Sequence, residues 1–136
     1  MKKIILTAVC IVFLAAQSHA QCTGTGTINF QRWNNITGSA VANLTSNINY
    51  PNNPSSTGTR TTFEMQTNLG SNLGIRMYGY ICPPTTGNYI FWIASDASGE
   101  LWISTNSSPA NKIRRAYNTS STNSRQWNKF ATQKSV

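Results

Sequence analysis

Acid–base chemistry in this chain of 136 residues would have to come from its three carboxylates, Glu64, Asp96 and Glu100. Asp96 and Glu100 lie four residues apart, and two carboxylates flanking a glycosidic bond can act as the acid and base of a glycoside hydrolase. With one further acid in the whole chain, this interpretation has little support. Glu100 is better interpreted as a strand-edge or salt-bridge residue, so we expect no catalytic residues and no enzyme activity.

Residues 1–20 have the three parts of a secretory signal peptide. Two lysines supply the charged start, residues 4–16 the apolar run, and residues 18–20 the small residues of a cleavage site. We therefore expect a secreted or cell-surface protein, bacterial in its asparagine-rich style, whose mature chain is one domain at residues 21–136. The one histidine, His19, lies in the signal, so nucleophilic and metal sites that need histidine are excluded.

Two cysteines, Cys22 and Cys82, remain once Cys10 leaves with the signal peptide. An even number of cysteines in an exported chain favours a disulfide, because the compartments outside the cytosol are oxidising. Closing the loop between them would stabilise the fold by about 4 kcal/mol through the entropy of the unfolded chain. We therefore predict a Cys22–Cys82 disulfide and no redox or catalytic thiol.

The balance of charge is strongly basic, with 11 lysine and arginine residues and a formal net charge of +8. On charge alone, nucleic acid or an anionic cell-surface polymer would suit as partners. The cations are nevertheless spread along the chain, and the one cluster, residues 112–115, has the alternation of a solvated strand edge. We therefore expect no nucleic-acid partner, and no segment of the mature chain is apolar over the length that a transmembrane helix needs.

Asparagine, threonine and serine recur between aromatic residues and glycines, which is typical of a β protein with long polar loops. The alternation of apolar and polar residues predicts five strands, at residues 25–30, 75–82, 89–95, 101–105 and 112–117. Residues 89–94 are apolar on both faces, so they should form a central strand of a sandwich or barrel. Two prolines between residues 50 and 60 predict an exposed loop.

One stretch of the sequence is similar to the centre of a known domain. It reads Tyr80-Ile-Cys-Pro-Pro-Thr-Thr-Gly-Asn-Tyr-Ile-Phe-Trp-Ile-Ala-Ser-Asp96 and continues with Gly99-Glu-Leu-Trp-Ile-Ser104. It resembles the PA-fourteen domain family, which is named for the N-terminal part of the anthrax-toxin protective antigen and includes lectin domains of yeast flocculins and epithelial adhesins. Residues 33–38 and 127–129 fit the same family, so the resemblance extends from about residue 26 to residue 135.

The resemblance implies an all-β fold, an antiparallel β-barrel or sandwich, that serves as a carbohydrate-binding module. Family members continue with at least two more strands, so we expect the last strands to be missing and residues 89–94 to be partly uncovered. The expected function is a secreted, non-enzymatic module that binds glycans or glycoconjugates and serves adhesion or targeting of a larger protein. The alternative is a structural or protein-interaction domain of a cell-surface protein, without a working sugar site.

A calcium site at Asp96 is a further implication of the resemblance. In the sugar-binding adhesins, two successive aspartates joined by a cis peptide bond hold a calcium ion that binds sugar hydroxyls. The first aspartate maps to Asp96, but the second position is Ala97, whose side chain has no oxygen. Calcium takes six to eight oxygen ligands, so the loss of one carboxylate weakens the site without having to abolish it. Alternatively, residues 96–99 form a hairpin turn and hold no ion.

Tryptophan supplies the other candidates, because an exposed indole can stack on a sugar ring. Trp33 and Trp127 lie among polar residues and are our candidate carbohydrate contacts, together with Asp96. A buried structural role is the alternative for each tryptophan. Trp92 and Trp102 fall on predicted strands, and we expect them in the core.

Overall fold

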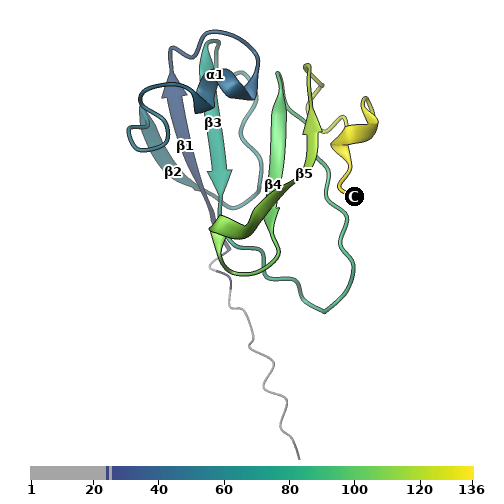
Figure 1. Ribbon diagram of the computed structural model, residues 1–136. Coiled ribbons are helices and arrows are strands. Elements are labelled where there is room, and N and C mark those ends of the chain that lie inside the picture. The colour runs from purple at the N-terminus through teal and green to yellow at the C-terminus, as the bar shows by residue number, and fades with distance from the viewer. Residues whose placement is uncertain (1–23, 25) are drawn as a thin grey trace, which may run out of the picture.

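The computed structural model describes residue 24 and residues 26–136 of the chain. Two small antiparallel sheets stand side by side, and the C-terminal segment lies at the outer side of the second (Figure 1). The prediction of an all-β antiparallel fold is confirmed, although the sheets formed by the described residues do not close into a barrel. The elements, with η for a 3-10 helix, are β1 (Ile28–Asn34), α1 (Val41–Thr45), β2 (Ser56–Arg60), β3 (Leu73–Tyr78), β4 (Gly99–Ser104), η1 (Pro109–Asn111), β5 (Lys112–Asn118) and η2 (Ala131–Gln133).

The first sheet has β1 between β2 and β3. Gln31 in β1 lies opposite both Thr57 of β2 and Arg76 of β3, so polar side chains from all three strands share one face. The strand β2 falls inside the segment 50–60, and the prediction of a loop there is wrong for its last five residues. This stretch is polar, so its sequence does not show the apolar alternation by which a strand is predicted. It is a strand because its backbone pairs with β1.

The core lies at the end of the first sheet, where α1 packs on it. Trp33 is 1% exposed, and its ring lies 5.0 Å from that of Tyr50, while its indole N–H donates to the carbonyl of Asn49 at 3.1 Å. Leu44 of α1 sits above Gly74 of β3, so closely that a Cβ at position 74 would lie 2.7 Å from a Leu44 methyl group. The missing side chain of Gly74 therefore allows the helix to cover Trp33.

The second sheet consists of β4 and β5, whose register changes by one residue. Leu101 lies opposite Ala116, but Trp102 lies opposite Arg114, so Arg115 is the extra residue of a β-bulge. A bulge re-aims the side chains that follow it. Here it brings Arg114, rather than Arg115, opposite Trp102. The predicted strands at 101–105 and 112–117 correspond to β4 and β5.

Residues 89–95 were expected to form a central strand, and this prediction is wrong. The segment is extended, but its one bridge pairs Trp92 with Lys134 of the C-terminal segment. Tyr89, Ile90 and Trp92 are each between 41% and 49% exposed, so the side chains that should fill a core lie at the surface. A segment that is apolar on both faces becomes central only where strands flank it on both edges, and the described residues flank one edge.

Three further predictions are the signal peptide, the Cys22–Cys82 disulfide and the lack of a transmembrane helix in the mature chain. The signal peptide and Cys22 lie outside the described residues. Cys82 is disulfide-bonded, and a Cβ built on Gly24 would lie 3.8 Å from its sulfur. Among residues 26–136, no helix has the length and apolar character needed to cross a membrane.

Candidate functional site

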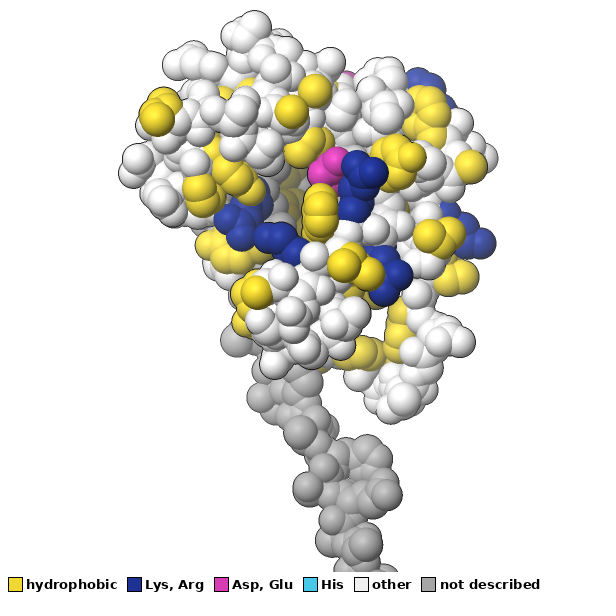
Figure 2. All heavy atoms as spheres, in the orientation of Figure 1, with side chains coloured by type: hydrophobic (Ala, Val, Ile, Leu, Met, Phe, Trp, Pro, Cys, Tyr) yellow, Lys and Arg dark blue, Asp and Glu magenta, His cyan; other side chains and the backbone are white. Residues whose placement is uncertain are grey.

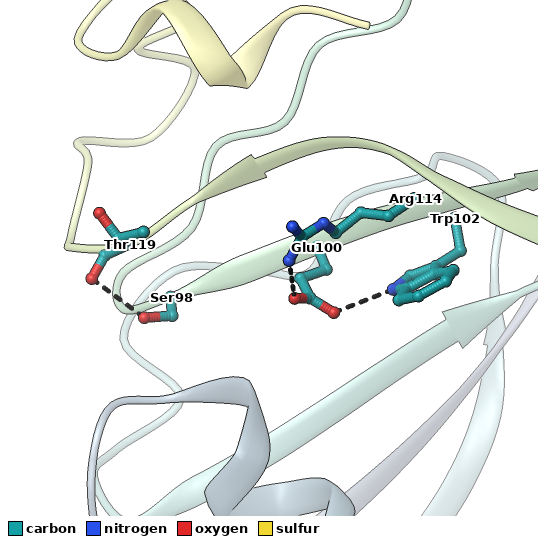
Figure 3. Close-up of polar contacts among 5 residues, drawn as sticks. All are labelled: Ser98, Glu100, Trp102, Arg114 and Thr119. Carbon is teal, nitrogen blue, oxygen red and sulfur yellow. Dashed lines mark hydrogen bonds and ion pairs between the residues drawn. The ribbon is translucent and has the colours of Figure 1, made fainter.

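The strongest candidate for a binding residue is Trp102 in β4, immediately after the bulge. Its side chain is 47% exposed, and the indole N–H donates to Oε2 of Glu100 at 3.0 Å (Figure 3). A tryptophan at the surface is usually free to rotate about its side-chain bonds, but this hydrogen bond fixes the ring plane. The ring therefore presents an oriented aromatic surface to solvent.

Glu100 is held in turn by a cation from the neighbouring strand. The guanidinium of Arg114 donates to Oε1 of Glu100 at 2.8 Å and also stacks over the ring of Tyr117, with its carbon 4.3 Å from the ring centroid. The bulge makes this possible, because it aligns Arg114 with Trp102 across the sheet. Glu100 is thus a salt-bridge residue, as predicted, and its two oxygens each fix a different partner.

These three side chains, which we call the Trp102 platform (Glu100, Trp102 and Arg114), combine an aromatic face with charged hydrogen-bonding groups. Figure 2 shows acidic, basic and hydrophobic side chains gathered in a hollow between the two sheets. The side chain of Arg114 is 44% exposed, so its remaining N–H groups can reach a ligand. Such a platform can stack on an apolar ring face and exchange hydrogen bonds with hydroxyl groups beside it.

The loop at Asp96 is organised around a buried amide. Asn118, which is 1% exposed, donates through Nδ2 to the carbonyl of Ala97 at 2.7 Å and to that of Ser120 at 2.8 Å. The hydroxyl of Ser95 also donates to the carbonyl of Ala97, at 2.7 Å. The Asp96–Ala97 peptide bond is trans, since Tyr50–Pro51 is the one cis bond of the described chain.

These residues do not fit a calcium ion. Calcium needs six to eight oxygens, usually including several carboxylates, and Asp96 is the loop's single carboxylate. The described residues contain no cluster of three or more aspartate, glutamate, histidine or cysteine side chains. The carbonyl of Ala97 already accepts two hydrogen bonds, so it is not available as a replacement ligand. The loop is a bend at Asp96 and Ala97 that Asn118 holds through its side chain. It is not the hairpin turn of the alternative prediction, because β4 pairs with β5 and segment 89–95 pairs with the C-terminal segment.

The structure separates the two tryptophans predicted to contact carbohydrate. Trp33 is buried in the core and has no free ring face, so its prediction as a sugar contact is wrong. Trp127 is 46% exposed and lines a hollow of about 500 Å³ with Ile90, Phe91 and Trp92. Asp96 is exposed in its loop.

Trp92 and Trp102 were both expected in the core, yet they are 48% and 47% exposed. For Trp102 a signal was present in the sequence. Its neighbours Leu101 and Ile103 alternate with Glu100 and Trp102, which places the tryptophan on the same face as a charged residue. The position of Arg114 opposite Trp102 depends on the bulge, which shifts the register of β5 by one residue from strict alternation.

A second ion pair lies outside the platform. Arg125 donates to both oxygens of Glu64, at 3.2 and 2.8 Å, across 61 positions of the chain. This hydrogen bonding holds the pKa of Glu64 below its usual value and raises that of Arg125. Both groups are solvent-exposed, so the pair ties two loops together and contributes little to stability.

Comparison with known proteins gives two matches. The family model of the PA14 domain matches residues 32–134. Among curated proteins, N-acetyl-beta-glucosaminyl-glycoprotein 4-beta-N-acetylgalactosaminyltransferase 1 of Mus musculus is 33% identical over 85 residues, which are 62% of this chain and 8% of that protein. The chain therefore spans less than a tenth of the length of this relative. No solved structure matches the chain.

Proposed function

Since the chain belongs to the PA14 domain family, we propose that it is a non-enzymatic carbohydrate-binding module of a larger secreted or cell-surface protein, serving adhesion or targeting. The observation that carries the proposal is the Trp102 platform, an exposed indole oriented by Glu100 and Arg114. The name of the mouse relative refers to a glycoprotein glycan, which supports a carbohydrate-related role.

The platform suits a pyranose for physical reasons. The C–H groups on one face of a sugar ring pack on an indole, and the hydroxyls at its rim need partners that donate and accept. Arg114 supplies donors and Glu100 supplies acceptors, and each neutralises the other's charge. Neither group then has to be desolvated as an isolated ion when the sugar covers it.

The test is glycan binding by matched tryptophan variants. The mature chain is screened on an array of defined glycans, and the best ligand is titrated by calorimetry. We expect Trp102→Ala to weaken binding by at least about tenfold, which corresponds to about 1.4 kcal/mol. Trp127→Ala removes an equally exposed indole outside the platform and should leave the affinity unchanged.

The test also includes the calcium dependence of binding and the results that would contradict the proposal. Because the Asp96 loop does not fit a calcium ion, we expect the affinity to be the same in excess calcium and in chelator. Loss of binding with Trp127→Ala but not with Trp102→Ala would refute the platform as the site. A folded chain that binds no glycan would favour the alternative function, a structural or protein-interaction domain.

Export is part of the same proposal. Cys82 is disulfide-bonded, and structural disulfides persist in oxidising compartments. We propose Cys22 as its partner, because Cys10 belongs to the predicted signal peptide. Mass spectrometry of the exported chain should find Gln21 at the N-terminus and a Cys22–Cys82 peptide under non-reducing conditions. Retention of residues 1–20, or free thiols at both positions, would contradict export with cleavage.

A further inference from the structure

The face of the second sheet that holds the Trp102 platform carries a further cation, Lys112. Residues directly opposite each other in an antiparallel pair lie on the same face, and Trp102 lies opposite Arg114 while Ser104 lies opposite Lys112. Lys112 and Trp102 are therefore diagonal neighbours, which are about 7–8 Å apart and within reach of long side chains. The ammonium group of Lys112 can thus reach the rim of a ring that stacks on Trp102.

The charge of Lys112 is not neutralised by the described part of the chain. Its side chain is exposed, and its ammonium group forms no ion pair or hydrogen bond with any residue that the structure describes. Arg114, by contrast, is paired with Glu100 at 2.8 Å, so these two charges cancel. Asp96 lies in the loop before β4, whereas Lys112 is paired with the other end of that strand. One uncompensated positive charge therefore lies beside the platform.

The connection between β4 and β5 fixes where Lys112 lies. The hydroxyl of Ser104 donates to the carbonyl of Ser108 at 2.6 Å. The side-chain oxygen of Asn106 accepts from the N–H of Ser108 at 2.9 Å and from the side-chain amide of Asn111 at 3.2 Å. These bonds order the loop that leads into β5 at Lys112, so little conformational freedom is lost there when a ligand binds.

The wider surroundings of the platform are basic as well. Figure 2 shows lysine or arginine side chains on both sides of the hollow that holds an acidic side chain. The whole chain has 11 lysine and arginine residues against three carboxylates, and two of these carboxylates, Glu64 and Glu100, are paired with arginine. An excess of one sign of charge attracts ligands of the opposite sign and speeds their association. A neutral sugar makes no use of this charge, whereas an acidic sugar does.

We propose that the Trp102 platform binds acidic glycans, in which the sugar ring on Trp102 carries a carboxylate or a sulfate group. This inference rests on the proposed function and adds the class of sugar. The indole supplies the apolar contact, Glu100 and Arg114 bind hydroxyl groups, and the ammonium group of Lys112 pairs with the acidic group. A hydrogen bond between ionised groups is roughly twice as strong as one between neutral groups, so the acidic group sets the preference.

The test compares each acidic glycan with a neutral sibling. Tetragalacturonate is paired with its methyl ester, and κ-carrageenan tetrasaccharide with its desulfated form, so the charge changes while the rings and linkages stay the same. Calorimetric titration of the mature chain should show at least about tenfold tighter binding of the acid in one pair, and that pair identifies the acidic group. Lys112→Gln should abolish the preference. Lys134→Gln, the same change at an exposed lysine of the C-terminal segment, should keep it.

Failure of this inference differs from failure of the proposed function. Equal binding of acid and neutral sibling, or binding of neutral array glycans alone, would overturn the acidic class and leave a neutral-sugar site that Trp102→Ala weakens. Binding of no glycan by the folded chain would overturn both. Equal loss of the preference in Lys112→Gln and Lys134→Gln would mean that net charge attracts the acid, without this face. Tighter binding of single-stranded poly(dT) than of either acid would assign the face to nucleic acid.

Discussion

Trp33→Ala should reduce the free energy of unfolding by about 3–5 kcal/mol, the range seen when large aromatic residues are removed from a core. Trp33 is 1% exposed and packs with Ile36, Leu44 and Tyr50. Its N–H also satisfies the carbonyl of Asn49, which the variant would leave without that partner. Domains of this size are stable by about 5–15 kcal/mol, so the loss could leave a substantial fraction of the chain unfolded.

Urea denaturation of the mature chain measures this effect, with Trp127→Ala as the matched control. Trp127 is 46% exposed, so its removal should change the free energy of unfolding by less than about 1 kcal/mol. Trp33→Phe keeps an aromatic ring but loses the hydrogen bond to Asn49, and its effect should be intermediate. Equal effects of Trp33→Ala and Trp127→Ala would show that the core does not depend on Trp33.

The strands of the second sheet could be predicted from the sequence because the alternation that identifies each strand lies within the strand itself. The predicted strands at 101–105 and 112–117 differ from β4 and β5 by one or two residues at their ends. Leu101 and Ile103 alternate with polar or aromatic neighbours, and this period identifies a strand with two different faces. The pairing is antiparallel between strands that follow each other in the chain, which is the simplest arrangement for such a pair.

The segment 89–95 shows where local information is insufficient. Its composition predicts a strand buried on both faces, but burial depends on which other strands reach it. In the structure its partner is the C-terminal segment, 40 positions away, and that segment covers one edge. The apolar pattern alone indicates a central strand, whereas the exposure of Tyr89, Ile90 and Trp92 agrees with the expectation from the family resemblance that further strands cover residues 89–94.

In the candidate site, likewise, some residue roles were predicted from the sequence and others depend on tertiary contacts. The sequence predicted a strand-edge or salt-bridge residue at Glu100, because the chain has too few acids for a catalytic pair, and Glu100 forms the salt bridge with Arg114. The burial of Trp33 depends on α1 approaching Gly74, whereas Trp102 stays 47% exposed in the described part of the chain. Trp33 has polar neighbours in the sequence and is buried, whereas Trp102 has apolar neighbours and is exposed, so adjacent residues alone do not indicate the role of either tryptophan.

Gln133→Glu should destabilise the fold by about 3 kcal/mol or more at pH 7, although the substitution preserves the shape of the side chain. Gln133 is fully buried, and its amide donates to the carbonyls of Ile93 at 2.7 Å and Gln126 at 2.6 Å. A carboxylate cannot donate to either carbonyl, and it would carry a buried charge. The contact that holds segment 89–95 against the C-terminal segment would be lost first.

The pH dependence of this variant follows from the same environment. Burial and the two carbonyls favour the neutral acid, so the pKa of the introduced glutamate should rise in the folded state above its unfolded value. Stability is then greatest below the unfolded pKa and is lost as pH rises through the folded pKa. Urea denaturation at pH 4 and pH 7 should therefore show a smaller deficit, relative to the parent chain, at pH 4. Gln66→Glu makes the same change at an exposed glutamine and should have little effect at either pH. Equal behaviour of the two variants would mean that the Gln133 amide does not hold the segment in place.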